Sequence, residues 1–563
     1  MIGIKERCFT FVTIYLFKAA ALMVTPTVYA ADVYDVIIKN GRVLDGAGNP
    51  WIKADIAIKS GRFAKVGIVN GTSKKIIDAS GKYVSPGFID IMDQSGRVLL
   101  TNGLAENKLL MGVTSLIAGE GGTPVPVDDI PAYFNSLETR GISVNFGSFF
   151  NISQARIPVL GETDASPTQS QLLEMQLIVD KAMRAGVMGL SSALIYPPDA
   201  YASTSDIIEM AKAIAPYGGV YASHIRSEGR DLIEGINEFI EICEKAGVRG
   251  ELFHIKNAYA PNWGKAVHIA IDTINAARAR GVDVAADQYP YVAGGTGLDA
   301  TLPKWIFANG LDKALVEIMK PEVRVKMKQE IMDPASDSLV VASGGWKGVV
   351  LANSHLDEYR KFHNMNFEDI GAALGRDPAD VSWDIFVKAA SLRVGSGNNS
   401  RGPENMGGKR AMALFFMMTE HDVQTFMKQP WVAIGSDAGA ASELGAIDIL
   451  GLPHPRSYGT FARIIAKYHK ETGILTLADA VRKMTSWPAA RMRLKDRGTI
   501  QEGLWADAVI FDLETIKDNA TWNNPVSTPN GISHVLVNGT LTIENGVHTG
   551  ARSGKVLYGG GKQ

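Results

Sequence analysis

Two histidines, each followed two residues later by a cation, are the residues of this chain best suited to metal chemistry. They occur as His224 with Arg226 and as His254 with Lys256, each at the end of a short apolar run. Between them, residues 231–247 carry apolar side chains at a spacing close to 3.6, which predicts a helix. A helix that connects two neighbouring strands makes those strands parallel, so both histidines are expected at the carboxyl edge of one sheet.

Other polar side chains are predicted to lie at this edge, since they also end or follow apolar runs. They are Asp93, Gln94, Glu120, Tyr289, Tyr291 and Asp437. Two neutral imidazoles and a carboxylate, with a position left open for water, form the ligand set of a catalytic zinc. Zinc lowers the pKa of its water and polarises a carbonyl, and Asp437 could pass the proton to a leaving amine. Each residue alone is more often a core or loop residue, so the shared edge is what favours a site.

Two cations near these residues suit a substrate anion. Lys256 lies two residues beyond His254, which places both on the same side of an extended strand. Arg456 follows the last predicted strand, and a guanidinium donates two parallel hydrogen bonds to a carboxylate. For either cation alone a solvated surface position is equally reasonable, but their nearness to the metal and base candidates favours substrate binding.

The elements that would position these residues alternate between strands and helical or loop stretches. The candidate strands are Tyr83 to Asp93, Val113 to Glu120, Val144 to Phe149, Met188 to Leu194, Val220 to Ile225, Glu251 to Ile255, Val282 to Tyr289 and Val432 to Asp437. Eight parallel β/α units form a closed barrel with its active site at the carboxyl edge. The last strand follows an unusually long stretch, of which residues 298–353 or so are predicted to be an insertion that shapes substrate binding.

Both ends of the mature chain have the texture of short antiparallel strands. The predicted fold is therefore α/β: a TIM-type (β/α)8 barrel over residues 85–489, with a small β-sandwich domain built from residues 31–84 and 490–563.

The first thirty residues have the features of a signal peptide. Lys5 and Arg7 precede an apolar run, and Val28-Tyr29-Ala30 offers small residues for cleavage, so residues 1–30 are predicted to direct export to a periplasm or the outside. An uncleaved anchor is the alternative, but the uninterrupted apolar run is short for a membrane span. Cleavage would leave Cys243 as the only cysteine, on the apolar face of the predicted helix, where a buried structural thiol is expected.

The net charge of the chain bears on its expected partners. The net charge of −2 gives no reason to expect nucleic acid or an anionic membrane as a partner. A small molecule with a carboxylate is the expected substrate, and no membrane contact is expected after signal cleavage. The oligomeric state is left open.

Several short segments, taken in order, resemble the N-acyl-D-amino-acid deacylase (D-aminoacylase) family of the amidohydrolase superfamily. They are Ser85 to Asp90, Gly189 to Pro198, Tyr221 to Glu228, His254 to Lys256, Asp287 to Tyr291, Gly435 to Asp437, His454 to Phe461, Arg482 to Ser486, Asp496 to Gly498 and Ala506-Asp507. The resemblance runs over nearly all of the mature chain. It implies a barrel with a composite β domain, hydrolysis of an amide to a free amino acid, and zinc.

The resemblance also implies roles for particular residues. His224 and His254 would be metal ligands, and Asp437 would be the general acid/base. The substrate carboxylate would be bound by Lys256, Arg456 and either Tyr289 or Tyr291, and Met418 would line the pocket.

Two departures from the family pattern change the expected metal site. The family usually has His-x-His where this chain has Met92 and Gln94, which are poor zinc ligands, so one ion per chain is expected. The family also commonly has a cysteine ligand where this chain has Gly121, with Glu120 beside it. We hypothesise that Glu120 is the third ligand.

Three readings of the function follow from these residues. The leading one is a secreted, zinc-dependent amidohydrolase of N-acyl-D-amino acids, in which zinc-bound water attacks the acyl carbonyl. A second keeps the machinery but has a dipeptide or cyclic amide as substrate, because fold and metal do not fix the substrate. A third is a non-catalytic binding protein that has lost its metal site, although retention of His224, His254 and Asp437 argues against it.

Overall fold

The computed structural model describes residues 33–392, 411–441 and 454–562. The predicted signal peptide, residues 1–30, lies outside them. Within these ranges, no helix combines the length and the apolar character needed to cross a membrane.

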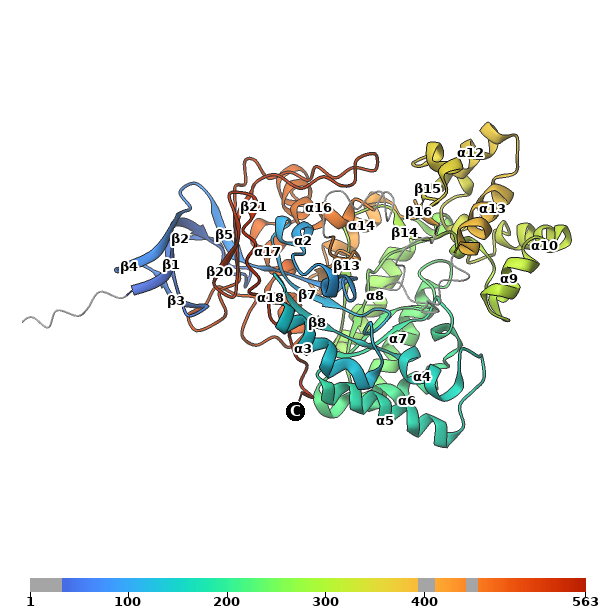
Figure 1. Ribbon diagram of the computed structural model, residues 1–563, viewed down its shortest axis with the longest axis horizontal. Coiled ribbons are helices and arrows are strands. Elements are labelled where there is room, and N and C mark those ends of the chain that lie inside the picture. The colour runs from blue at the N-terminus through green and yellow to red at the C-terminus, as the bar shows by residue number, and fades with distance from the viewer. Residues whose placement is uncertain (1–32, 393–410, 442–453, 563) are drawn as a thin grey trace, which may run out of the picture.

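One nine-stranded sheet combines strands from both ends of the chain (Figure 1). Its strands are β1 (Val33–Val43), β2 (Ile52–Lys59), β3 (Arg62–Gly67), β4 (Thr72–Asp78), β5 (Tyr83–Pro86), β18 (Ala508–Phe511), β19 (Ile532–Val537), β20 (Thr540–Glu544) and β21 (Val547–His548). The two ends meet where β5 pairs antiparallel with β18, with Ser85 opposite Val509. The ends of the chain therefore share one sheet, as predicted, and the sandwich and the domain boundaries stay predictions.

The middle of the chain contains two parallel sheets. One has the strands β6 (Phe88–Asp93), β7 (Val113–Ala118) and β8 (Asn145–Ser148). The other has β9 (Phe150–Asn151), β10 (Gly189–Ala193), β11 (Val220–His224), β12 (Arg249–Leu252), β13 (Val284–Gln288) and β17 (Val432–Ile434). Seven of the eight predicted strand ranges thus contain an observed strand. The eighth, Glu251 to Ile255, only overlaps β12, which begins at Arg249 and ends at Leu252. A parallel bridge between Asp93 and Ala438 brings the end of β6 beside the end of β17.

Helices connect and cover these strands. The helix predicted between the two histidines is α7 (Leu232–Ala246), which buries its apolar face and ends at Gly247 with a φ of 66°. The other α-helices here are α1 (Val98–Thr101), α2 (Glu106–Leu110), α3 (Ile130–Arg140), α4 (Ile152–Leu160), α5 (Gln169–Ala185), α6 (Thr204–Lys212), α8 (Ala266–Ala279), α16 (Arg456–Arg463), α17 (Leu477–Met484) and α18 (Ser486–Arg491). The polypeptide after β11 therefore returns through α7 to begin β12 in the same direction, as expected.

A separate group of elements lies between β13 and β17, at the opposite end of the molecule from β1 to β4 (Figure 1). It has an antiparallel sheet of β14 (Gly294–Gly297), β15 (Val349–Asn353) and β16 (Met412–Phe415). Its helices are α9 (Leu311–Glu317), α10 (Pro321–Ile331), α11 (Leu339–Ala342), α12 (Phe367–Leu374) and α13 (Pro378–Ser391), and α14 (Glu420–Met427) precedes β17. These elements extend beyond the predicted insertion at 298–353 and include α12 and α13. The sequence did not indicate this, because α12 and α13 have the same apolar period as helices that cover a sheet.

Candidate metal centre and substrate cavity

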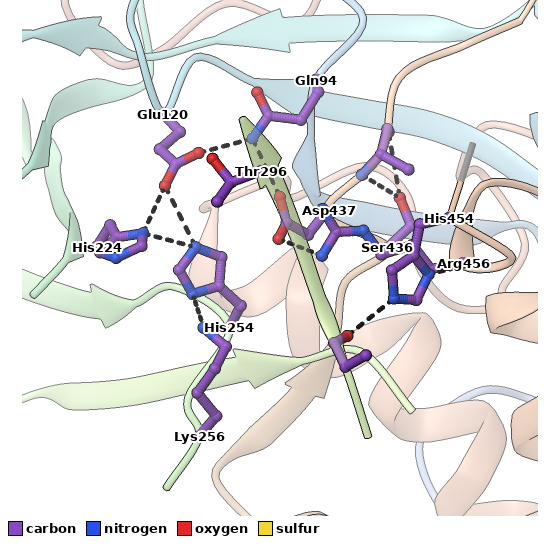
Figure 2. Close-up of polar contacts among 12 residues, drawn as sticks. Gln94, Glu120, His224, His254, Lys256, Thr296, Ser436, Asp437, His454 and Arg456 are labelled. Carbon is purple, nitrogen blue, oxygen red and sulfur yellow. Dashed lines mark hydrogen bonds and ion pairs between the residues drawn. The ribbon is translucent and has the colours of Figure 1, made fainter. Parts of the chain in front are cut away.

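Three potential ligand atoms converge at the carboxyl ends of β7, β11 and β12 (Figure 2). Oε1 of Glu120 lies 3.0 Å from Nδ1 of His224 and 3.2 Å from Nε2 of His254. The two ring nitrogens are 3.1 Å apart, and all three side chains are buried. The sequence-predicted ligands are thus brought to one point.

The donor set fits a zinc ion. A carboxylate oxygen and two imidazole nitrogens are normal zinc ligands, and neutral imidazoles can direct a lone pair from each facing nitrogen toward a shared cation. In the absence of a proton or a cation between them, these lone pairs repel one another. Together the three residues could hold one ion.

Glu228, which sequence reasoning did not single out, lies behind both histidines. Its Oε1 is 2.9 Å from Nδ1 of His254, and its Oε2 is 3.5 Å from Nε2 of His224. If Nδ1 of His254 donates its proton to Glu228, Nε2 keeps the lone pair that binds a metal. Burial raises the pKa of Glu228, but His224 and Lys256 outweigh burial and lower it. The signal available in the sequence was its position four residues after His224.

The backbone at His254 is held in a left-handed conformation, with a φ of 37°. The His254 N–H donates to Oδ1 of the buried Asp287 at 2.9 Å. A non-glycine residue in this conformation costs about 1 kcal/mol or more, and such strain is commonly found at functional sites. Burial and the neighbouring Glu251 raise the pKa of Asp287 well above its usual value.

Lys256 reaches the site by a different route from the one predicted. Strand β12 ends at Leu252, so the alternation of an extended strand does not place Lys256 beside His254. Instead Lys256 contacts Glu228, and its Nζ lies 2.7 Å from Nδ1 of His254. Burial and Lys256 lower the pKa of His254, whereas Glu228 and Asp437 raise it, with a net rise to about 10.

Asp437 and Arg456 form an ion pair at the edge of this cluster. Nη1 of Arg456 lies 2.7 Å from Oδ2 of Asp437, and the guanidinium is 4.8 Å from the centre of the Tyr289 ring. The backbone of Asp437 is also left-handed, with a φ of 49°, and its N–H donates to the carbonyl of Met92 at 2.8 Å. The general-base candidate is therefore fixed next to the candidate metal ligands, and one predicted substrate cation is bound to it.

A cavity of about 260 Å³ opens onto these residues. The predicted residues on its wall are Gln94, Glu120, His224, His254, Lys256, Tyr289, Asp437 and Arg456. The antiparallel sheet between β13 and β17 supplies an opposite, largely apolar wall through Gly294 to Thr296, Ala352 and Met412 to Phe415. The elements that follow β13 thus help to enclose the site.

Two predicted substrate residues lie away from the cavity wall. The Tyr291 hydroxyl donates to Oδ2 of Asp518 at 3.2 Å, so Tyr289 is the tyrosine that faces the cavity. Met417 lines the cavity and the neighbouring Met418 does not.

His454 is a further cavity residue whose role sequence reasoning missed. Its Nε2 donates to the carbonyl of Ala293 at 2.8 Å, and its Nδ1 accepts from the backbone N–H of Arg456 at 3.0 Å. Burial and the neighbouring Arg456 hold the pKa of His454 well below its usual range, so the ring is neutral. His454 therefore links Ala293, the residue before β14, to the segment that carries Arg456.

Comparison with known proteins gives the same relatives in sequence and in structure. A model of the amidohydrolase family matches residues 411–543. The D-aminoacylase of Alcaligenes xylosoxydans xylosoxydans is 28% identical over 546 residues, which cover 93% of this chain and 97% of that protein. The resemblance to the D-aminoacylase family is confirmed.

Two solved structures of D-amino-acid deacylases superpose on nearly the whole chain. A crystal structure of D-aminoacylase has a TM-score of 0.75 at 29% identity and covers 93% of this chain and 100% of its own. An N-acyl-D-glutamate deacylase from Bordetella bronchiseptica, in complex with zinc and a phosphonate inhibitor, has a TM-score of 0.74 at 27% identity and covers 94% and 100%. The relatives are thus hydrolases of amide C–N bonds, and this chain has a candidate metal site in the same architecture.

The departures from the D-aminoacylase pattern are visible in the structure. Met92 is 1% exposed and packs in an apolar cluster with Phe253 and Ala433, so it does not face the ligand atoms. Gln94 contacts Glu120 and Asp437 through its side-chain amide. Neither residue therefore supplies the imidazole that the family usually has at its position.

Proposed function

We propose that this protein is an exported, zinc-dependent amidohydrolase that cleaves the amide bond of N-acyl-D-amino acids. The observation that carries the proposal is the convergence of Glu120, His224 and His254 beside Asp437, in a chain similar over 93% of its length to D-aminoacylase. We also propose that the two parallel sheets close into one (β/α)8 barrel, because the Asp93 to Ala438 bridge joins their outer strands.

One zinc ion per chain would be held by Glu120, His224 and His254. Bound there, zinc would supply Lewis-acid polarisation of the acyl carbonyl and a water of lowered pKa. Support for a single ion comes from Met92, which is buried in an apolar cluster, and from Gln94, whose amide nitrogen is a poor ligand.

The protein groups around this position would bind and orient the substrate. Arg456 carries five N–H donors, so it can contact Asp437 and a substrate carboxylate at the same time. Lys256 adds a second positive charge on the cavity wall, and the ring of Tyr289 contacts both cations. The carboxylate would thereby place the neighbouring amide next to the metal ligands.

Asp437 would transfer the proton. Its carboxylate would accept a proton from the attacking water and donate it to the nitrogen of the leaving amine as the C–N bond breaks. The products are a free carboxylic acid and a free amino acid. The left-handed backbone of Asp437 and its two side-chain partners hold it in place for both transfers.

Metal content after dialysis tests the ligand set. Glu120→Ala is expected to lose most of its metal, because two histidines alone hold zinc weakly, and the wild type is expected to keep one ion per chain. Retention of full metal content by Glu120→Ala would refute Glu120 as a ligand. Elemental analysis of both proteins after the same dialysis gives the answer.

Turnover of matched N-acyl-D- and N-acyl-L-amino acids tests the substrate. Release of free amino acid from the D series is expected, with much less from the L series. Cleavage of the L series only, or of neither, would contradict the D-specific proposal, and cleavage of dipeptides or cyclic amides instead would favour the second substrate class. Export is tested by sequencing the amino terminus of protein recovered outside the cytoplasm, which is expected to begin near Ala31.

A further inference from the structure

The geometry points to Gln94 as a positioning residue that ties the metal ligand Glu120 to the proton-transfer group Asp437. This inference rests on the proposed function and assigns a role to a residue that lies where the family usually has a histidine. Gln94 lies directly after β6 and lines the cavity.

One amide nitrogen contacts both carboxylates (Figure 2). Nε2 of Gln94 donates to Oε2 of Glu120 at 2.7 Å and to Oδ1 of Asp437 at 3.2 Å. A primary amide nitrogen carries two protons, so each carboxylate receives one of them. Both donors of Gln94 are therefore used within the site.

The surrounding charges fix the orientation of this amide. If the amide were flipped, Oε1 of Gln94 would face two carboxylates and the hydrogen bonds would be replaced by repulsion. In the observed orientation Oε1 points away from Glu120 and Asp437, and it is a buried oxygen that has no hydrogen-bond partner among the described residues (Figure 2). The two bridging bonds thus outweigh the cost of leaving that oxygen unpaired.

Gln94 contacts one oxygen of each carboxylate, and the other oxygen of each has a different partner. Gln94 holds Oε2 of Glu120, which leaves Oε1 facing the two histidine nitrogens as a single ligand atom. Gln94 also holds Oδ1 of Asp437 while Arg456 contacts Oδ2. Glu120 is thereby kept as a one-oxygen ligand, and Asp437 is kept at a fixed distance from it.

A neutral amide between Glu120 and Asp437 has a different effect from a second cation at the same place. Two neighbouring carboxylates repel each other and attract a cation, and the amide satisfies both without adding charge. The space between the carboxylates is then filled by the amide of Gln94. Gln94 would thus keep the site at one ion.

The main chain holds Gln94 firmly. Its N–H donates to the carbonyl of Ala438 at 3.3 Å, and the preceding Asp93 pairs with the fully buried Lys108, whose Nζ is 2.8 Å from Oδ2. Lys108 also contacts the carbonyl of Ala438. One buried cation therefore links the segment that carries Gln94 to the segment that carries Asp437, which suits a positioning role.

The test removes the two donors while keeping the size of the side chain. In Gln94→Leu we expect metal affinity, measured by competition with a chelator, to fall about 10- to 100-fold, the usual effect of losing a hydrogen bond to a metal ligand. We expect kcat of the metal-saturated enzyme to fall and KM to stay close to that of the wild type. Gln288→Leu is the matched control, because Gln288 is a buried glutamine at the end of β13 that does not line the cavity, and it is expected to keep both values.

Two further variants keep the result interpretable. Gln94→Asn keeps the amide but is one methylene too short to reach both carboxylates, so it is expected to change metal affinity in the same direction. Gln94→Glu replaces the donors by a third carboxylate and is expected to bind more than one metal ion per chain. Wild-type metal affinity and kcat in both Gln94→Leu and Gln94→Asn would overturn the inference.

The outcome also separates this inference from the proposed function. Suppose that the wild type binds one ion and cleaves N-acyl-D-amino acids, and that Gln94→Leu and Gln94→Asn have the same metal affinity and kcat. This result would refute only the role of Gln94. A wild-type protein that binds no metal would overturn both.

Discussion

The two ends of strands β12 and β13 both carry buried charges, but the charges are arranged differently. On the amino side, Nε of Arg491 lies 2.8 Å from Oε2 of Glu251, the third residue of β12, and Arg491 also contacts Asp283, which precedes β13. At the carboxyl end, Glu120 and two imidazoles direct potential ligand atoms at one another. Positive charge meets negative charge at the first end, whereas at the second end the facing atoms need a proton or a cation between them.

This difference shows which kind of buried charge indicates a function. A buried ion pair whose members face each other stabilises a junction, here between α18 and the start of β12. A cluster of facing ligand atoms is stable only with a proton or a cation among them, so it is a candidate ion site. The contrast agrees with the general division of parallel α/β folds, in which the carboxyl end carries the site and the amino end contributes to stability.

The largest expected effect comes from a change at the carboxyl end. Asp437→Asn removes the proton-transfer group but keeps its size, so we expect kcat to fall by about 10²- to 10⁴-fold. Metal content and the free energy of unfolding should change little, because Asp437 is not one of the three proposed ligands. Steady-state kinetics with elemental analysis measures this, and an unchanged kcat would remove Asp437 from the mechanism.

The reciprocal change at the amino end should affect stability alone. Arg491→Met leaves the carboxylate of Glu251 buried without its partner, and breaking a buried pair in this way costs about 3–5 kcal/mol. Denaturant unfolding measures the loss, while metal content and kcat of the folded protein should match the wild type. Arg360→Met is the matched control, because its ion pair is exposed and worth about 0–1 kcal/mol. Loss of metal in Arg491→Met would contradict the prediction that this ion pair affects stability alone.

Local pattern predicted most of the strands and the helix between the histidines. The strand ranges and α7 follow from apolar periodicity, and parallel strands joined by a helix bring His224 and His254 to one edge. The extent of the elements after β13 could not be predicted, because α12 and α13 have the same period as helices that cover a sheet. Periodicity identifies a helix but not the domain against which it packs.

The hydrogen bonds within the site were beyond reach of the sequence. Gln94 and Asp437 are 343 residues apart, and their contact depends on how the ends of β6 and β17 meet. Glu228 lies beyond a strand end in a turn, where its direction depends on the loop conformation. Residue type indicated the candidate metal ligands, but only tertiary structure shows which groups orient them.

The smallest expected effect concerns Cys243, which lies at the amino end of β12. Its thiol is buried on α7 against Gly250, and burial raises the thiol pKa, so the unreactive protonated form persists. Cys243→Ala is expected to cost about 1 kcal/mol of unfolding free energy through lost packing, with kcat and metal content unchanged. Denaturant unfolding and kinetics on the same preparation measure both. A loss of metal in this variant would contradict the assignment of the amino end to stability, because the thiol would then be coupled to the ligands at the other end of the strand.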